Sequence, residues 1–106
     1  MIRHIVLIRF KPDMTEARIA AIFDELHLIE GRLDGLMNIT SGRSESPEKI
    51  ERGYLHGFVA DFVDWAALQA YQDHPMHKAV GAQLVANAVG GLDGILVFDL
   101  PVEPSV

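Results

Sequence analysis

The chain has 106 residues, a length typical of one domain with one hydrophobic core. Hydrophobic residues make up 49% of it, and its 15 acidic residues outnumber the nine Lys and Arg residues, which gives a net charge of -6 with neutral histidines. A surface of this sign repels phosphate backbones, so we expect no nucleic-acid partner. The chain has no cysteine, which excludes a disulfide framework and a thiolate nucleophile.

The amino-terminal segment MIRHIVLIRF begins with an apolar run that Arg3, His4 and Arg9 interrupt. This run is too short to span a membrane and lacks the small-residue cleavage site of a secretory signal. The absence of cysteine agrees with a reducing compartment. We therefore expect a soluble cytoplasmic protein without a membrane partner.

Residues 2–10 are rich in β-branched side chains and predict a first strand. One of its faces carries His4, Val6, Ile8 and Phe10, and its other face is also partly apolar. A strand with one face in water alternates more cleanly, so both faces of this strand are expected to be covered.

A helix is predicted over residues 16–33, with Thr15 as its N-cap and with Gly31 and Gly35 as its stop. The periodicity places its apolar residues on one stripe: Ile19, Ile22, Phe23, Leu26 and Ile29.

Two further strands follow, over residues 36–43 and 54–62, separated by a polar loop over residues 44–53. Alternation in the second of these strands puts one set of side chains on a common face: His56, Phe58, Ala60 and Phe62.

A second helix is predicted to begin at Trp65 behind the cap Asp64. Proline restricts the residue before it to extended conformations, so His74 is expected to form a joint before Pro75. Pro75 suits the first turn of a new helix, which is predicted over residues 75–89.

A last strand over residues 95–100, followed by an exposed tail over residues 101–106, completes the order β-α-β-β-α-β. This order is typical of the α+β ferredoxin-like fold, an antiparallel sheet with helices on one face. The other face is too apolar for water, with Ile5, Leu7 and Val59 among its candidates, together with Leu55. We expect a homodimer with the two sheets face to face, in which the second and fourth strands or the tail reach across.

Four segments together resemble the stress-responsive α/β barrel domain (Dabb) family: IRHIVLIRFK, RGYLHGFVADF, ALQAYQDHPMHKAV and ILVFDL. The resemblance covers nearly the whole chain, and the Tyr-x-x-His-Pro-x-His stretch is its most specific part. It implies a single Dabb domain over residues 1–106 that pairs into a dimeric α/β barrel.

One characterised branch of that family, the olivetolic acid cyclases of plants, closes a polyketide by a cofactor-free aldol condensation. Its catalytic tyrosine and histidine resemble Tyr71 and His77, and its pocket histidines resemble His4 and His56. Aromatic residues of that enzyme's pocket are replaced here by aliphatic ones such as Leu26, which leaves the substrate open.

The residues themselves allow two interpretations of Tyr71 and His77. A helix N-terminus disfavours an imidazolium, so His77 behind Pro75 is suited to be a neutral general base. Tyr71 then orients that imidazole or donates a hydrogen bond to a developing enolate oxygen. The alternative is structural, with His77 capping the joint and Tyr71 packing on the sheet.

His4 and His56 are each expected on the helix-covered face, side by side if their strands are neighbours at the centre of the sheet. As functional residues they would bind the substrate's polar groups, and we count Val6 and Ile8 with them as substrate-binding residues. As structural residues they would be buried histidines bonded to the backbone or to each other.

His74 and His77 form an H-x-x-H pattern beside Asp73, but the proline joint between the two histidines spoils helical pairing. We therefore predict no metal and no cofactor. His27, near Glu30, is expected on the solvent side of the first helix.

Three functions remain open at this point. The first is cofactor-free acid–base catalysis, cyclase-like or lyase-like, on a small keto or polyketide-like compound. The second is a non-catalytic stress-responsive binding or scaffold dimer. The third is a cofactor-free monooxygenase, whose substrate must itself give an electron to oxygen.

Overall fold

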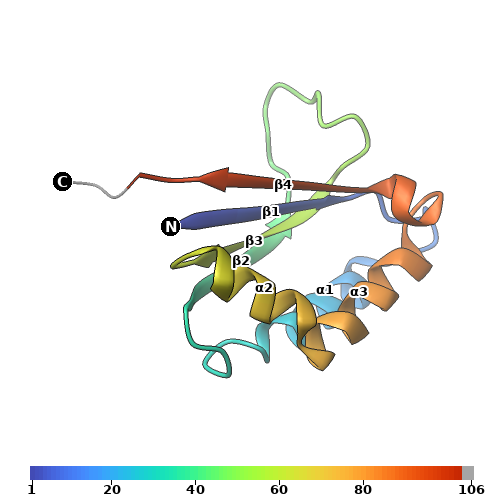
Figure 1. Cartoon of the computed structure of the whole chain (residues 1–106). Coiled ribbons are helices and arrows are strands. Elements are labelled where there is room, and N and C mark those ends of the chain that lie inside the picture. Colours follow the sequence, from blue (N-terminus) through green and yellow to red (C-terminus); the bar gives the residue numbers. More distant parts are fainter. Residues whose placement is uncertain (104–106) are drawn as a thin grey trace.

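The computed structural model describes residues 1–103. Its order of elements confirms the α+β ferredoxin-like prediction (Figure 1). The elements are β1 (Ile2–Ile8), α1 (Glu16–His27), β2 (Leu36–Arg43), β3 (His56–Phe62), α2 (Trp65–Asp73), α3 (Pro75–Asn87), the 3-10 turn η1 (Gly91–Gly94) and β4 (Ile95–Pro101). The predicted tail is described only in part, because its residues 104–106 lie outside the described residues.

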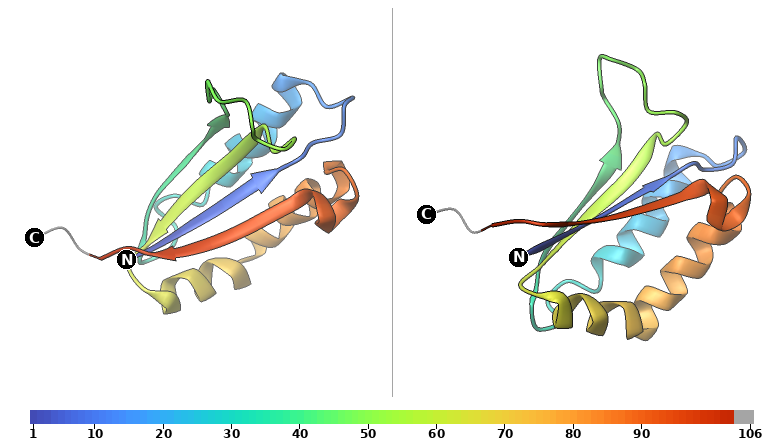
Figure 2. Two further views of the ribbon diagram at one scale, coloured as in Figure 1. Left: turned by 90° about the horizontal axis from the view of Figure 1, so that it is seen from above. Right: turned by 45° about the horizontal axis from the view of Figure 1, so that its top comes forward.

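The sheet has the strand order β2-β3-β1-β4, and every neighbouring pair is antiparallel. The first and third strands are therefore the central pair, which meets the condition set above for His4 and His56 to lie side by side. All the helices cover one face of the sheet, and the opposite face is open (Figure 2). The loop between β2 and β3 rises on the open side (Figure 1).

Several boundaries differ from the prediction. The first strand ends at Ile8 rather than at Phe10. The Arg9 amide still donates to Gly94, its neighbour in line with β4, at 2.8 Å, but the Arg9 carbonyl accepts from the amide of Val89 instead and so leaves the ladder. Phe10 then forms an isolated bridge with Ala88. The third strand begins at His56, two residues after the predicted start.

The first helix ends at His27, well before the predicted stop at residue 33. The backbone from Leu28 to Arg32 continues in tight turns whose amides bond carbonyls three residues back. These turns still bury Ile29 completely, so its predicted core position is confirmed.

The joint between α2 and α3 is built as predicted. Asp64 caps α2 by accepting from the amide of Ala67 at 2.8 Å. His74 is extended, with φ -70° and ψ 134°, because Pro75 follows it. The Nδ1 atom of His74 accepts from the amide of Met76 at 3.1 Å, which makes His74 the cap of α3.

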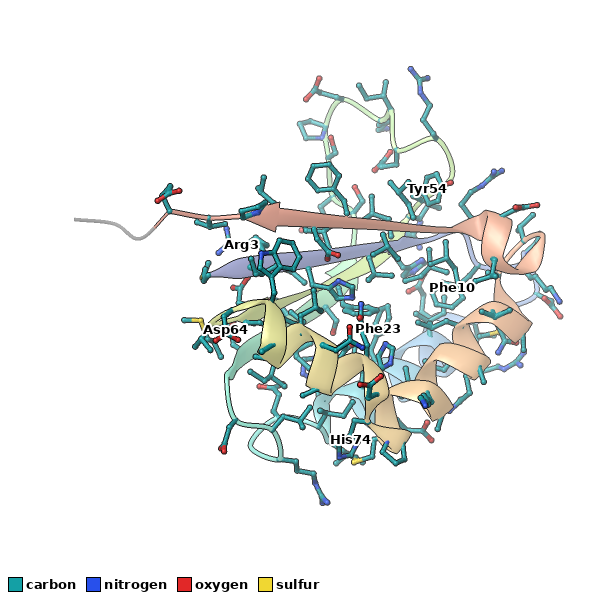
Figure 3. The ribbon with its side chains drawn as sticks, viewed as in Figure 1. Arg3, Phe10, Phe23, Tyr54, Asp64 and His74 are labelled. Carbon is teal, nitrogen blue, oxygen red and sulfur yellow. The ribbon has the colours of Figure 1, made fainter. Side chains whose placement is uncertain are left out.

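The core lies between the helices and the even-numbered side chains of β1 and β3. Aromatic rings run through it at edge-on angles, from Phe10 to Phe23 and from Phe23 to Phe58, each pair 6.2 Å apart. In Figure 3, Phe10 lies towards the beginning of β4 and Arg3 towards its carboxyl end, which marks the two ends of this layer. Among residues 1–103, no helix is both long enough and apolar enough to cross a bilayer.

Candidate active site

The structure divides the predicted site residues between the two ends of the helix-covered face. His4 lies opposite Ala60 in the β1–β3 ladder, whereas His56 lies opposite Ile8. Four residues along a strand correspond to about 13 Å. The two histidines share a face, as expected, but the expectation that they lie side by side is wrong.

The Tyr71 cluster comprises Tyr71, His77, His4 and Asp99. The ring centroids of Tyr71 and His77 are 4.3 Å apart, and those of Tyr71 and His4 are 5.8 Å apart. Tyr71 is completely buried, and its hydroxyl finds no hydrogen-bond partner within residues 1–103. Buried polar atoms are nearly always hydrogen-bonded, so this hydroxyl stands out as a group with an unused donor.

His77 is half-buried at the start of α3, with its Nδ1 atom 3.2 Å from the carbonyl oxygen of Gln72. A carbonyl can only accept, so Nδ1 carries the proton in the neutral ring and the lone pair is on Nε2. Burial is the largest influence on the pKa of His77 and lowers it, while the bond to Gln72 acts in the opposite direction. Positive charge at His4, His74 and Lys78 lowers this pKa further.

The protein environment shifts the pKa values of Tyr71 and His77 in opposite directions. Burial raises the pKa of the Tyr71 phenol, so Tyr71 stays protonated. The lowered pKa of His77 keeps its imidazole neutral at pH 7. A protonated donor and a neutral base in ring contact are the components of general acid–base catalysis.

Asp99 is a member of the cluster that sequence reasoning missed. Its Oδ1 atom lies 2.5 Å from Nδ1 of His4, a buried side chain directly opposite it in the β1–β4 ladder. The carboxylate holds the His4 ring in one orientation beside Tyr71. A lone acid in the apolar strand ILVFDL was the available signal, but pairing it with His4 requires the strand register.

The His56 cluster comprises His56, Glu16 and Arg43. The Nε2 atom of buried His56 lies 2.9 Å and 3.1 Å from the two carboxylate oxygens of Glu16. Arg43 donates to the same carboxylate at 2.6 Å. The bond from His56 is the main cause that lowers the pKa of Glu16, and the bond from Arg43 adds to it. His56 is therefore a buried histidine with a partner, but that partner is the Glu16 carboxylate rather than the backbone or His4, the partners expected in the structural alternative.

Three hollows of about 340, 190 and 100 Å³ border His56. Their linings include Leu7 and Leu55 but not Tyr71, His77 or His4. None of the three hollows brings His56 together with the other three candidate residues.

The two apolar residues predicted to bind substrate belong to the packed core. Val6 is 4% exposed and Ile8 is not exposed at all. Ile8 lies opposite His56 rather than beside the Tyr71 cluster. Neither side chain presents a free surface to a ligand in this conformation.

The H-x-x-H pattern does not assemble into a metal-ligand set. No three His, Cys, Asp or Glu side chains in the described part of the chain are grouped as metal ligands. The Nδ1 atom of His74 is already engaged as the acceptor for the amide of Met76.

The comparisons with known proteins agree with this architecture. The family model for the stress responsive A/B barrel domain matches residues 2–102. A stress-response A/B barrel domain-containing protein of Arabidopsis thaliana is 26% identical over 101 residues, which is 94% of this chain and 85% of that protein.

Two solved structures show the same fold. A dimeric ferredoxin-like protein from Jannaschia sp. CCS1 is 36% identical, covers 95% of this chain and 98% of its own, and superposes with a TM-score of 0.89. The hydroxynitrile lyase of Passiflora edulis is 17% identical over 99% of this chain and 95% of its own, with a TM-score of 0.81, a likeness of fold alone. With the family model matched over nearly its whole length, this chain belongs to the stress-responsive A/B barrel domain (Dabb) family.

Proposed function

We propose that this chain is a cofactor-free acid–base catalyst that acts on a small keto or polyketide-like compound at the Tyr71 cluster. The observation that carries the proposal is the buried Tyr71 hydroxyl, which lacks a partner and adjoins a neutral His77. An unpartnered buried donor costs about 1–3 kcal/mol. A ligand oxygen that accepts its hydrogen bond removes that cost.

The proposed reaction begins with proton transfer from a carbon next to a substrate carbonyl to Nε2 of His77. The C–H electron pair becomes an enolate, and the Tyr71 hydroxyl donates a hydrogen bond to its oxygen. The enolate carbon forms a bond to a second carbonyl carbon of the substrate. The imidazolium of His77 returns its proton to the new alkoxide, which leaves both residues as they began.

His4 and Asp99 act as positioning residues in this scheme. The Asp99 carboxylate fixes the His4 ring, which lies edge-on to the ring of Tyr71 with the two centroids 5.8 Å apart. Tyr71 is enclosed in the structure, so a substrate needs room that the packed conformation does not offer. We propose that this room opens at the joint at His74, where Pro75 has no amide hydrogen to bond back into α2.

The test is a thermal-shift screen against aromatic acids, β-keto compounds and medium-chain acyl compounds, on the wild type, His77→Ala and Tyr71→Phe. A ligand that binds the folded state raises the melting temperature. We expect a wild-type shift that both variants lose, while the matched control Tyr54→Phe keeps it. A shift that is equal in all four proteins would place binding elsewhere and contradict the proposal.

A second function, a binding or scaffold dimer, is favoured by the open face of the sheet. In addition to the apolar residues predicted for this face, the structure places an exposed apolar row from β4 on it: Leu96, Phe98 and Leu100. Such a patch usually marks an interface, and the 36% identical Jannaschia protein is described as dimeric. We propose a homodimer with these faces packed together.

Glycines make that interface testable without disturbing the single chain. Gly42 lies opposite Gly57 on the open face, and a Cβ added at Gly42 meets nothing within 4 Å. We expect Gly42→Leu to shift the mass in light scattering from twice 11.7 kDa to 11.7 kDa. Gly81→Leu, at a helix position that is equally open, is the control and should leave the dimer intact. If Gly42→Leu kept the mass of the wild type, packing through this face would be refuted.

The ligand screen on His77→Ala, combined with the mass of that variant, distinguishes a scaffold from a catalyst. If dimerisation is the whole function, His77→Ala keeps the wild-type mass and no compound in the screen shifts the wild type. If catalysis is the function, ligand shifts depend on His77 even in a chain that still dimerises.

A further inference from the structure

A hydroxyl, an imidazole and a carboxylate form a connected row outside the sites described above. The Oγ atom of Ser41 lies 2.8 Å from Nε2 of His27, and Nδ1 of His27 bonds to Oε1 of Glu30. This is the order in which an acid orients a histidine and the histidine activates a serine. The expectation that His27 only faces solvent is therefore incomplete, since it also contacts β2.

The fold brings these three residues together from two elements. His27 is the last residue of α1, and the tight turn that follows returns Glu30 to it. Ser41 lies on the edge strand β2, with its side chain on the helix-covered face. A carboxylate can only accept, so the proton of neutral His27 is on Nδ1 and the Nε2 lone pair faces the Ser41 hydroxyl.

The backbone offers a donor at the same place. In an antiparallel pair, amides alternate between pointing to the neighbouring strand and pointing away. Ser44 donates to the carbonyl of Leu55 at 2.7 Å, so Ser41, three residues earlier, belongs to the set that points away from β3. Within residues 1–103, no strand lies beyond β2 in this sheet, so the Ser41 amide is at an open edge beside its own hydroxyl.

A small groove between α1 and β2, the same hollow that borders His56, lies next to this row, because its lining includes Gly42, the residue after Ser41. Its volume is about 100 Å³, and its walls include Ala20, Phe23 and Arg43. Phe23 lies one helical turn before His27, and Arg43 lies two residues after Ser41 on the same face of β2. One side of the groove, at Ala20 and Phe23, is apolar, and this is the side on which the proposal places a short acyl chain.

We propose that Ser41, His27 and Glu30 form a second catalytic site that hydrolyses short-chain acyl esters. The Ser41 oxygen attacks the ester carbonyl carbon as its proton passes to His27, and the Ser41 amide donates to the resulting oxyanion. The bond to the alcohol oxygen breaks, and that oxygen takes the proton from His27. Water then gives a proton to His27 and attacks the acyl carbon. The bond from that carbon to the Ser41 oxygen breaks, the Ser41 oxygen takes the proton back from His27, and the carboxylic acid is released.

The first test is covalent labelling with an alkyl fluorophosphonate, with the adduct located by peptide mass spectrometry. We expect one adduct per chain, on Ser41, and a labelling rate at least tenfold lower in His27→Ala. Ser44→Ala, whose hydroxyl bonds Glu51 rather than a histidine, is the matched control and should label like the wild type. No adduct, an adduct at another residue, or equal rates with and without His27 would overturn the proposal.

A second test does not depend on the stability of Ser41→Ala. The chain has no cysteine, so Ser41→Cys carries a single thiol whose alkylation by iodoacetamide can be followed against pH. A histidine that accepts from this position lowers the thiol pKa, so we expect faster alkylation at pH 7 than in the double variant Ser41→Cys with His27→Ala. Identical pH profiles would show that His27 does not activate position 41.

Discussion

The two ends of the helix-covered face satisfy their buried polar groups in opposite ways. At one end, the His56 imidazole is bonded to Glu16, and Arg43 completes the set. At the other end, the Tyr71 hydroxyl is buried without a partner within residues 1–103. Among residues 1–103, the first end has hollows but no buried side-chain polar atom without a partner, whereas the second has such an atom, in a side chain that is closed to solvent. A buried group that the fold leaves unpaired points to a ligand more strongly than a hollow does.

The largest expected effect comes from the ring that separates the two ends. Phe58 contacts the rings of His4 and Phe23, each at a centroid distance of 6.2 Å. Phe58→Ala should lower the free energy of unfolding by about 3–5 kcal/mol, because it leaves a cavity in the core. Urea denaturation measures this loss. Phe58→Leu, which keeps most of the volume, should cost less than half as much, and equal losses would show that volume is not the cause.

The next largest effect on stability is expected at Asp99, whose carboxylate is bonded to His4. Asp99→Asn keeps the shape of the side chain but removes the charge from a 2.5 Å bond. We expect a loss of about 1.5–3 kcal/mol in the free energy of unfolding, typical of a hydrogen bond to a charged group. Asp93→Asn, at an exposed position in η1, is the control and should change the urea midpoint little. An unchanged midpoint for Asp99→Asn would mean that the bond does not stabilise His4.

Tyr71→Phe should change activity and stability in opposite directions. Removing the unpartnered hydroxyl should raise the free energy of unfolding, by up to about 1–3 kcal/mol, while abolishing the ligand shift. Thermal and urea melts measure the first effect, with Tyr54→Phe as the control. A destabilised Tyr71→Phe protein would show that the hydroxyl already has a stabilising partner.

The lowered pKa of His77 predicts that the stability of the protein depends on pH through the Tyr71 end of the helix-covered face. The ordinary value is 6.5, so the unfolded chain takes up the proton before the folded chain does as the pH falls. Stability should therefore decrease from about pH 6.5 down to the folded pKa. His77→Gln should flatten this slope in melts recorded between pH 7 and pH 5. A slope that the variant keeps would assign the titration to another histidine.

The smallest expected effect is at the His56 end, where Glu16 is mostly exposed to solvent. Its pKa is lowered from the ordinary value of 4.5, so its contribution to stability is present above that value and is lost as the pH falls through the folded pKa. Glu16→Gln should melt slightly below the wild type at pH 7 and level with it at pH 3. Glu48→Gln, in the β2–β3 loop, is the control, and a difference that persists at pH 3 would exclude a role for the charge.

Much of this molecule follows from local patterns in the chain. Alternation in residues 54–62 and periodicity in residues 16–29 identify the buried faces correctly, because burial imposes a period of two on strands and 3.6 on helices. Pro75 alone specifies the joint at His74, since the ring restricts the residue before it. The family resemblance singles out Tyr71 and His77, which the structure brings into ring contact.

Which residues that are distant in sequence contact each other was decided by the tertiary structure. Strand register alone decides that His4 meets Asp99 and that His56 lies four residues away along the sheet, because a strand pattern has a period but no absolute alignment. The early end of α1 turns Glu30 back to His27, and β2 places Ser41 against it, which no spacing in the sequence indicates. The chain by itself determined which faces of its strands and helices are buried, and it singled out Tyr71 and His77 as candidates for chemistry. Only folding decided which residues share a site, because side-chain contacts across a sheet join residues that are far apart in sequence.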